Sequence, residues 1–268
     1  MRRTAATLIA LAYAVGLLLA GCASSSVTGG SSTESSVSGS SSAPVSGTVN
    51  VFAAASLKDA FTTLGQQFEA AHPGVTVVFN FGPSSGLATQ IAQGAPADVF
   101  ASASTKNMDQ VVTAGAALSP TSFASNVMEI VVPAKNPAAI TALADLAKPG
   151  VKVALCQSAA PCGVTAATVF SNAKFTVTPV TQEVDVKAVL TKVTLGEVDA
   201  GVVYVTDVRA AGAQVRGIEI STDVNASTKY PIATVTEAPN KATAQAFTDY
   251  VLSAGAASVL SAAGFAKP

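Results

Sequence analysis

Short apolar segments alternate with segments of helical periodicity from about residue 48 to the C-terminus. The first pair is a strand expected at residues 48–53 and a helix that Ser56 opens, with Asp59 as its capping-box partner. The apolar side chains of this helix predict one buried stripe: Leu57, Ala60, Phe61, Leu64 and Phe68. Strands that alternate with helices predict an α/β fold with mostly parallel sheets flanked by helices.

The same alternation sets the other expected elements. Strands are expected at residues 75–81, 98–101, 129–132, 151–155, 177–180, 200–205 and 232–236. Helices are expected at residues 87–91, 140–147, 164–173, 186–195, 241–252 and 256–262. No internal repeat is strong enough to use, and roughly 220 residues could form one doubly wound sheet or two smaller ones.

Residues 1–22 form a predicted export signal. Arg2 and Arg3 precede an apolar segment at residues 4–20, which is shorter than the ~20 residues that a membrane-spanning helix needs. The segment ends in the letters LAGC, with small residues before Cys22. This ending resembles a bacterial lipobox, which implies cleavage before Cys22 and attachment of lipid to its sulfur. The alternative is a signal-anchor whose cysteine falls there by chance.

Residues 23–46 are mostly Ser, Gly, Thr and Ala and show no apolar periodicity. Such a segment cannot bury enough surface to offset its ordering entropy, so we expect a flexible tether. The folded body is expected to begin near Gly47. Signal and tether together predict an extracytoplasmic protein, held to the outer face of the cell membrane by lipid on Cys22.

Composition excludes several classes of protein. Apolar residues make up 49% of the 268 residues and charged residues 12%, which argues against disorder. The formal net charge is -1 and no basic patch stands out, so nucleic acid is not an expected partner. His72 is the single histidine, which excludes a multi-histidine metal site and argues against most histidine-dependent catalysis.

Cys156 and Cys162 are the two cysteines of the expected folded body. Outside the cytoplasm, a pair this close in sequence usually forms a disulfide. A redox pair or half of a metal site are the alternatives. The spacing is not C-x-x-C and no further Cys or His supplies ligands, so a structural bridge that pins this loop is favoured.

Four expected strand-to-helix turns could offer hydrogen-bond donors to an anion. Helix N-termini carry unpaired N–H groups and partial positive charge. Ser56 and Ser84 lie at two such junctions, and Cys162 and Val186 lie at two more. Taken singly, Ser56 could be only a helix cap and Ser84 only a turn residue. Tyr204 ends an apolar strand and could be only a core tyrosine with its hydroxyl at the surface.

A second interpretation of Ser84 is a hydrolase nucleophile. Residues 82–86 match the pattern G-x-S-x-G between a strand and a helix. That fold takes its acid and its histidine after the serine, and no histidine follows Ser84. A Ser–Lys pair stays open, although no lysine is placed by spacing. The enzyme reading is therefore a remote alternative.

The order of the motifs resembles that of the periplasmic molybdate-binding proteins of ABC importers. Each motif is modest, but the ordered set is specific and runs from about residue 48 to the end. The matching segments are VFAAASL (51–57), FGPSSGLATQI (81–91), GAPADVFASA (94–103), PCG (161–163), EVDVK (183–187), GVVYVTD (201–207) and GF (264–265).

The resemblance implies a type II, two-lobed periplasmic-binding-protein fold, in which the oxyanion lies in the cleft between two hinged α/β lobes. Lobe 1 is expected at residues 47–130 plus 233–268, and lobe 2 at residues 131–232. The chain is expected to cross near residues 127–133 and to return near residues 230–236.

The resemblance also assigns the ligand-binding residues. Ser56 and Ser84, from lobe 1, would each donate a hydroxyl and a backbone N–H. From lobe 2, Cys162 and Val186 would donate backbone N–H groups, and Tyr204 would donate its phenol.

Three positions depart from the family pattern. Pro83 stands where a small polar residue is frequent, Gly86 replaces a frequent hydroxyl residue, and Cys162 takes a place often held by Ala. A backbone donor tolerates the change at Cys162, so these departures concern fine selectivity more than ligand class.

Molybdate or tungstate is the expected ligand, with no cofactor and no metal bound directly as a cation. A pocket of donors suits an anion with no proton to donate, whereas phosphate keeps a proton at neutral pH. Sulfate passes this test, so a sulfate receptor of the same fold is the alternative. No Arg or Lys is assigned to the candidate turns, so neutral dipoles are expected to hold the charge. The expected partner is an ABC transporter permease, and the expected form is a monomer.

Overall fold

The computed structural model describes residues 45–268. The predicted signal segment, Cys22 and the predicted tether up to residue 44 lie outside the described residues. Within the described part, none of the helices has the length and apolar character needed to cross a bilayer.

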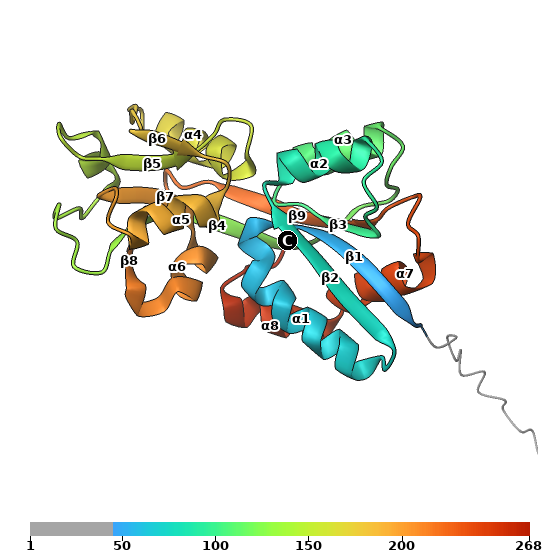
Figure 1. The fold of residues 1–268 in the computed structure, drawn as a ribbon. Coiled ribbons are helices and arrows are strands. Elements are labelled where there is room, and N and C mark those ends of the chain that lie inside the picture. The colour runs from blue at the N-terminus through green and yellow to red at the C-terminus, as the bar shows by residue number, and fades with distance from the viewer. Residues whose placement is uncertain (1–44) are drawn as a thin grey trace, which may run out of the picture. The chain divides into compact units, whose positions relative to one another are not determined.

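One mixed sheet carries the fold (Figure 1). Its strand order is β2-β1-β3-β9-β4-β7-β5-β6, and β8 pairs with β4 beside this path. The strands are β1 (Gly47–Ala54), β2 (Val75–Gly82), β3 (Val99–Ala101), β4 (Thr121–Pro133), β5 (Val153–Cys156), β6 (Thr181–Glu183), β7 (Ala200–Tyr204), β8 (Val215–Glu219) and β9 (Ser227–Thr234).

Helices flank this sheet. The α-helices are α1 (Lys58–Ala71), α2 (Ser84–Ala92), α3 (Thr105–Thr113), α4 (Pro161–Asn172), α5 (Val186–Thr194), α6 (Val205–Ala211), α7 (Lys241–Val251) and α8 (Ala254–Ala263). The described residues also contain three short 3₁₀ segments: η1 (Ala55–Leu57), η2 (Leu143–Ala147) and η3 (Gly212–Gln214). The expected α/β fold with flanking helices is confirmed.

Parallel and antiparallel pairings are equally frequent, which differs from the expectation of mostly parallel sheets. β1 pairs in parallel with β2 and β3, and β5 pairs in parallel with β6 and β7. The antiparallel pairings all involve β4 or β9. These two long strands connect the two parallel groups. Their pairing is antiparallel because the chain runs out along β4 and returns along β9, and a strand–helix–strand unit does not link them.

β4 is the strand along which the chain passes from one parallel group to the other. Its residues 121–127 pair with β9, and its residues 128–133 pair with β7 and β8. This change of partner falls in the range where the crossing was expected. The boundaries of the two lobes stay a prediction.

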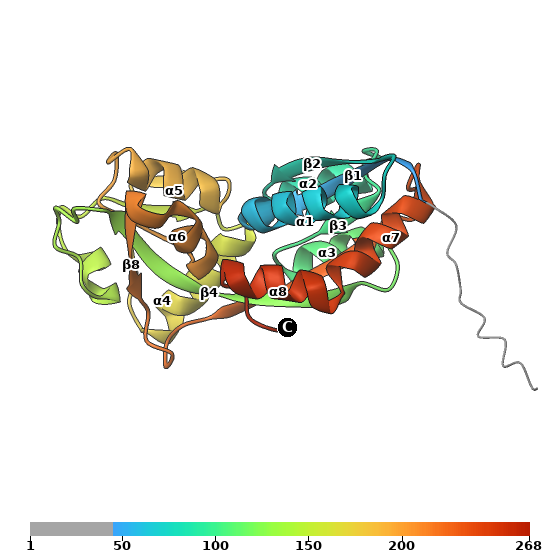
Figure 2. The same cartoon turned by 90° about the horizontal axis from the view of Figure 1, so that it is seen from below.

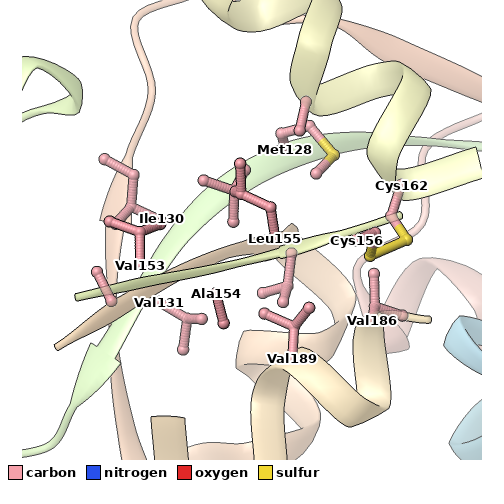
Figure 3. Close-up of a cluster of buried hydrophobic side chains, with 14 of the residues drawn as sticks. Met128, Ile130, Val131, Val153, Ala154, Leu155, Cys156, Cys162, Val186 and Val189 are labelled. Atoms are coloured by element: carbon pink, nitrogen blue, oxygen red, sulfur yellow. A yellow bond between two sulfur atoms is a disulfide. The ribbon is translucent and has the colours of Figure 1, made fainter. Parts of the chain in front are cut away.

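The buried side chains form separate clusters on the two sides of this crossing. Two clusters draw on β1, β3 and β9 with α1, α2, α3, α7 and α8, and Figure 2 shows α1, α7 and α8 beside one another. The third draws on β4, β5 and β7 with α4 and α5, and Figure 3 shows part of it. Each parallel group therefore has its own apolar core, which holds the strand ends and helix starts in place.

Several expected elements differ from the structure. Residues 177–180 form no strand, because Pro179 removes a donor, and pairing starts at Thr181 in β6. Residues 140–147 contain only η2, where the Asp145 carboxylate accepts from the N–H groups of Thr141 and Ala142. Sequence reasoning gave no elements for α3, α6 or β8.

Candidate functional site

A cavity of about 20 Å³ has all five predicted ligand residues in its wall: Ser56, Ser84, Cys162, Val186 and Tyr204. The other lining residues are Ala54, Ala55, Gly82, Pro83, Ala103, Ala160, Pro161 and Asp185. One water needs roughly 10–15 Å³ of such space, so this cavity has the scale of a single small ion and not of an organic solute. The structure thus gathers the five residues, although their role in binding stays a prediction.

Ser56 lies in η1, between β1 and α1, and does not cap the helix as expected. The N-cap of α1 is Leu57, and no side chain caps this end. The Ser56 Oγ instead lies 2.9 Å from the hydroxyl of Tyr230 on β9. The capping-box prediction is therefore wrong, because a buried partner 174 residues away takes the serine hydroxyl.

Ser84 is the first residue of α2 and is 1% exposed. Its Oγ accepts a hydrogen bond of 3.0 Å from the backbone N–H of Ala103. Because this bond uses an oxygen lone pair, the serine keeps its own hydrogen for another acceptor. The first N–H groups of any α-helix lack intrahelical partners, and the N-cap Pro83 supplies no side-chain acceptor for those of α2.

Cys162 lies in the first turn of α4, directly after Pro161. The structure contains the Cys156–Cys162 disulfide, which joins the end of β5 to this turn (Figure 3). Gly163 packs so closely against the carbonyl of Gln157 that a Cβ there would overlap it. The first hydrogen bond of α4 is donated by Val164, so the Cys162 N–H precedes the helical ladder.

Val186 is the first residue of α5. Asp185 caps this helix, and its Oδ1 accepts from the N–H of Ala188 at 3.0 Å. The side chains of Val186 and Cys162 belong to the same buried cluster, which Figure 3 shows. The Val186 side chain thus anchors the turn, while its N–H precedes the first helical bond of α5, which Val189 donates.

Tyr204 is the last residue of β7 and is 1% exposed, so its hydroxyl is not at the surface. Among residues 45–268, no group meets this buried hydroxyl with hydrogen-bond distance and angle, although the Thr165 hydroxyl lies near enough to lower its pKa. An unsatisfied buried polar group costs about 1–3 kcal/mol, so this hydroxyl is a candidate donor to a ligand. Burial raises the pKa of the Tyr204 phenol, so it stays a donor in alkaline solution.

Lys187 corrects the expectation that no cationic residue lies in the candidate turns, because it directly follows Val186. Its Nζ lies 2.7 Å from Asp59 Oδ2 and 3.4 Å from Asp207 Oδ1. Two carboxylates therefore balance this cation, and it does not line the cavity. Sequence reasoning missed the network, although Lys187 and Asp207 lie inside matching segments.

The same network connects to Tyr204. The Asp207 Oδ2 accepts from the backbone N–H of Tyr204 at 3.2 Å. Burial raises the pKa of Asp207 to about 6, against the opposing effect of Lys187. Burial lowers the pKa of Lys187, but Asp207 and Asp59 more than offset this effect, so its pKa is raised.

The wall of the cavity thus presents hydrogens and few acceptors. The hydroxyls of Ser84 and Tyr204 donate to no group in the described protein. The Ser56 hydroxyl shares one hydrogen bond with Tyr230, in which either atom could donate. The carboxylate in the lining, that of Asp185, is engaged by its own helix. Such a wall suits an anion with several oxygens. No cluster of His, Cys, Asp and Glu able to hold a metal ion occurs among residues 45–268.

The sequence matches the family described as bacterial extracellular solute-binding protein over residues 49–266. It is 44% identical to the molybdate-binding protein ModA of Mycobacterium tuberculosis over 219 residues, which cover 81% of this chain and 84% of that protein.

Solved structures share the fold. The periplasmic molybdate-binding protein of Azotobacter vinelandii superimposes with a TM-score of 0.73 at 21% identity, covering 82% of this chain and 99% of that one. The sulfate-binding protein SubI of M. tuberculosis gives a TM-score of 0.72 at 19% identity, covering 81% and 86%. Because proteins for both anions share this fold, the fold alone does not select the ligand.

Proposed function

Because the chain belongs to the bacterial extracellular solute-binding protein family, we propose that it binds molybdate in the cavity between Ser56 and Tyr204 and delivers it to an ABC transporter. This family consists of solute-binding proteins for transport and not of enzymes, so the hydrolase reading of Ser84 is set aside. The 44% identity to a molybdate-binding protein supports the choice of ligand.

One observation supports the proposal most: three hydroxyl groups that could donate to a ligand line one cavity. Molybdate carries two charges and no proton, so each oxygen accepts and none donates. Hydrogen bonds to a charged partner contribute about 1.5–3 kcal/mol each, so several would support tight binding without a cationic side chain. Tungstate has nearly the same size and charge and is proposed as a second ligand.

We assign the cavity to a cleft between two lobes, at residues 47–130 plus 233–268 and at residues 131–232. The change of partner along β4 and the separate apolar clusters support this division. A ligand that contacts both sides favours the closed arrangement, and the transporter would recognise that arrangement.

Cys22 and the segment before it are the basis for the proposed location. Cleavage before Cys22 and lipid on its sulfur would hold a monomer at the outer face of the cell membrane, with residues 23–46 as the tether. Mass spectrometry of the membrane fraction tests this directly. A Cys22→Ala variant should lose the lipid mass and keep residues 1–21, because the same cysteine directs both steps.

Calorimetry on the soluble fragment from Gly47 tests the ligand. Molybdate and tungstate should each bind with a 1:1 stoichiometry, and phosphate should bind far more weakly, with an affinity measured by its competition with molybdate. Titration with sulfate distinguishes a molybdate receptor from a sulfate receptor of the same fold. Heat with sulfate but none with molybdate would overturn the proposal.

A further inference from the structure

Tyr230 lies on β9 and is fully buried behind Ser56. Its hydroxyl and the Ser56 Oγ are 2.9 Å apart, and either atom could donate in this pair. Asn126 also reaches this hydroxyl with a side-chain hydrogen bond that lowers the pKa of Tyr230, as a donor to the phenol oxygen does. Among the described residues, Ser56 is therefore the partner that can accept the Tyr230 hydrogen. The direction of this one hydrogen bond decides what Ser56 can offer to the cavity.

The number of available acceptors fixes that direction. If Ser56 donated, the Tyr230 hydrogen would be buried with no acceptor, which is the costly arrangement for a hydroxyl. If Tyr230 donates, its hydrogen is satisfied and the Ser56 hydrogen is left for the cavity. Burial raises the pKa of Tyr230 well above its ordinary value, so the hydrogen is present at all physiological pH values.

We propose that Tyr230 is a positioning residue, which holds Ser56 as a donor toward the cavity and so makes the site select oxyanions without a proton. This inference rests on the proposed function. Tyr230 is the one hydrogen-bond partner of the Ser56 hydroxyl among the described residues, so a serine hydrogen turned away from the ligand would have no other acceptor there. A ligand hydroxyl, such as that of hydrogen phosphate, therefore finds no acceptor at Ser56.

The surroundings of Tyr230 hold its ring in place. The ring makes edge contacts with Phe265, Tyr204 and Phe123, with centroids 5.2, 6.2 and 6.3 Å away. Such packing leaves the hydroxyl little freedom to leave Ser56. Ser84 is held in a similar way. The Ala103 N–H, which can only donate, occupies a lone pair of the Ser84 Oγ and leaves the serine hydrogen free to donate.

Tyr230→Phe tests the inference, because it removes the hydroxyl and keeps the ring. Calorimetry at about pH 8 compares molybdate with phosphate, which there carries two charges and one proton. We expect molybdate binding to weaken about 5- to 30-fold, as for loss of one oriented hydrogen bond, with phosphate binding unchanged or stronger. The ratio of the two affinities should fall by about tenfold.

Tyr250→Phe is the matched control, since the Tyr250 hydroxyl donates to Gln67 at 2.8 Å and lies outside the cavity wall. It should leave both affinities unchanged. In a Ser56→Ala background, Tyr230→Phe should have no further effect on the ratio, because the residue through which it acts is gone.

The outcomes separate this inference from the proposed function. If the wild type binds molybdate and Tyr230→Phe weakens molybdate and phosphate equally, or acts equally in the Ser56→Ala background, Tyr230 has only a structural role and the inference fails. A wild type that binds none of these oxyanions overturns the proposed function as well.

If Tyr230→Phe does not fold, proton NMR of the wild type decides. A slowly exchanging Tyr230 hydroxyl proton with a cross-peak to the Ser56 β-hydrogens supports the inference, and a Ser56 hydroxyl proton pointing at the Tyr230 ring overturns it.

Discussion

The two sides of the cavity hold their donors in different ways. On the side of Ser56 and Ser84, each serine oxygen is hydrogen-bonded inside the protein, to the Tyr230 hydroxyl and to the Ala103 N–H. With the donor direction proposed for Tyr230, both serine hydroxyls would be oriented before a ligand arrives. On the other side, Cys162 and Val186 offer backbone N–H groups at helix starts, and the Tyr204 hydroxyl has no partner among the described residues. Under the proposed function, one side would be oriented in advance, whereas the Tyr204 hydroxyl would gain its partner from the ligand.

The largest expected effect is that of Ser84→Ala on the oriented side. Loss of one hydrogen bond to a dianion should weaken molybdate binding about 10- to 100-fold, measured by calorimetry. The Ala103 N–H also loses its acceptor, so the variant should unfold at a lower temperature. Ser85→Ala is the control, since Ser85 does not line the cavity. Unchanged affinity in Ser84→Ala would remove this serine from the site.

Tyr204→Phe should separate binding from stability. Molybdate affinity should fall by about tenfold or somewhat more, because a donor is lost. The ligand-free protein should keep its free energy of unfolding or gain up to about 1 kcal/mol, because a buried hydroxyl without a partner is removed. Chemical denaturation without ligand measures this sign. A clear loss of stability would mean that the hydroxyl has a protein partner and that the two sides do not differ.

The Cys156→Ser, Cys162→Ser double variant tests whether the disulfide holds the backbone N–H of residue 162 in place. The closed loop is short, so its removal should lower the free energy of unfolding by about 2 kcal/mol. Molybdate affinity should fall less, by about 3- to 10-fold, because the N–H of residue 162 stays but is no longer held by the bridge. Denaturation and calorimetry on the same preparation give both values. An affinity loss as large as that of Ser84→Ala would mean that the bridge does more than hold the loop that carries the N–H of residue 162.

The smallest expected effect is that of Asp59→Asn. Asp59 on α1 lies near Ser56 in sequence, and its partner Lys187 follows Val186, so this ion pair joins the two sides of the cavity. Exposed pairs contribute about 0.2–1 kcal/mol, so molybdate affinity should fall about 2- to 5-fold at low salt and less at high salt. Glu197→Gln is the control, because Glu197 pairs with Lys192 on one side only. Equal effects of the two variants would show that the pair does not act between the sides.

Local sequence signals predicted much of the fold and the position of the candidate site. The strand ends and helix starts around Ser84, Cys162 and Val186 are set by glycines, prolines and an Asp cap, so periodicity and turn chemistry located them. The order of motifs then indicated which of these turns face one cavity. The short elements α6 and β8 were missed, because seven or five residues carry too little periodicity to detect.

The sequence by itself indicated the alternation of strands and helices, the cysteine pair and five of the residues that line the cavity. Only the tertiary structure decided which remote groups the candidate donors contact. The Tyr230 hydroxyl reaches Ser56 across 174 positions and Lys187 reaches Asp59 across 128, and neither pair leaves a local pattern. Hydrogen bonds and ion pairs depend on distances of a few ångström, and such distances between remote segments exist only once β4 and β9 have brought the two parallel groups together.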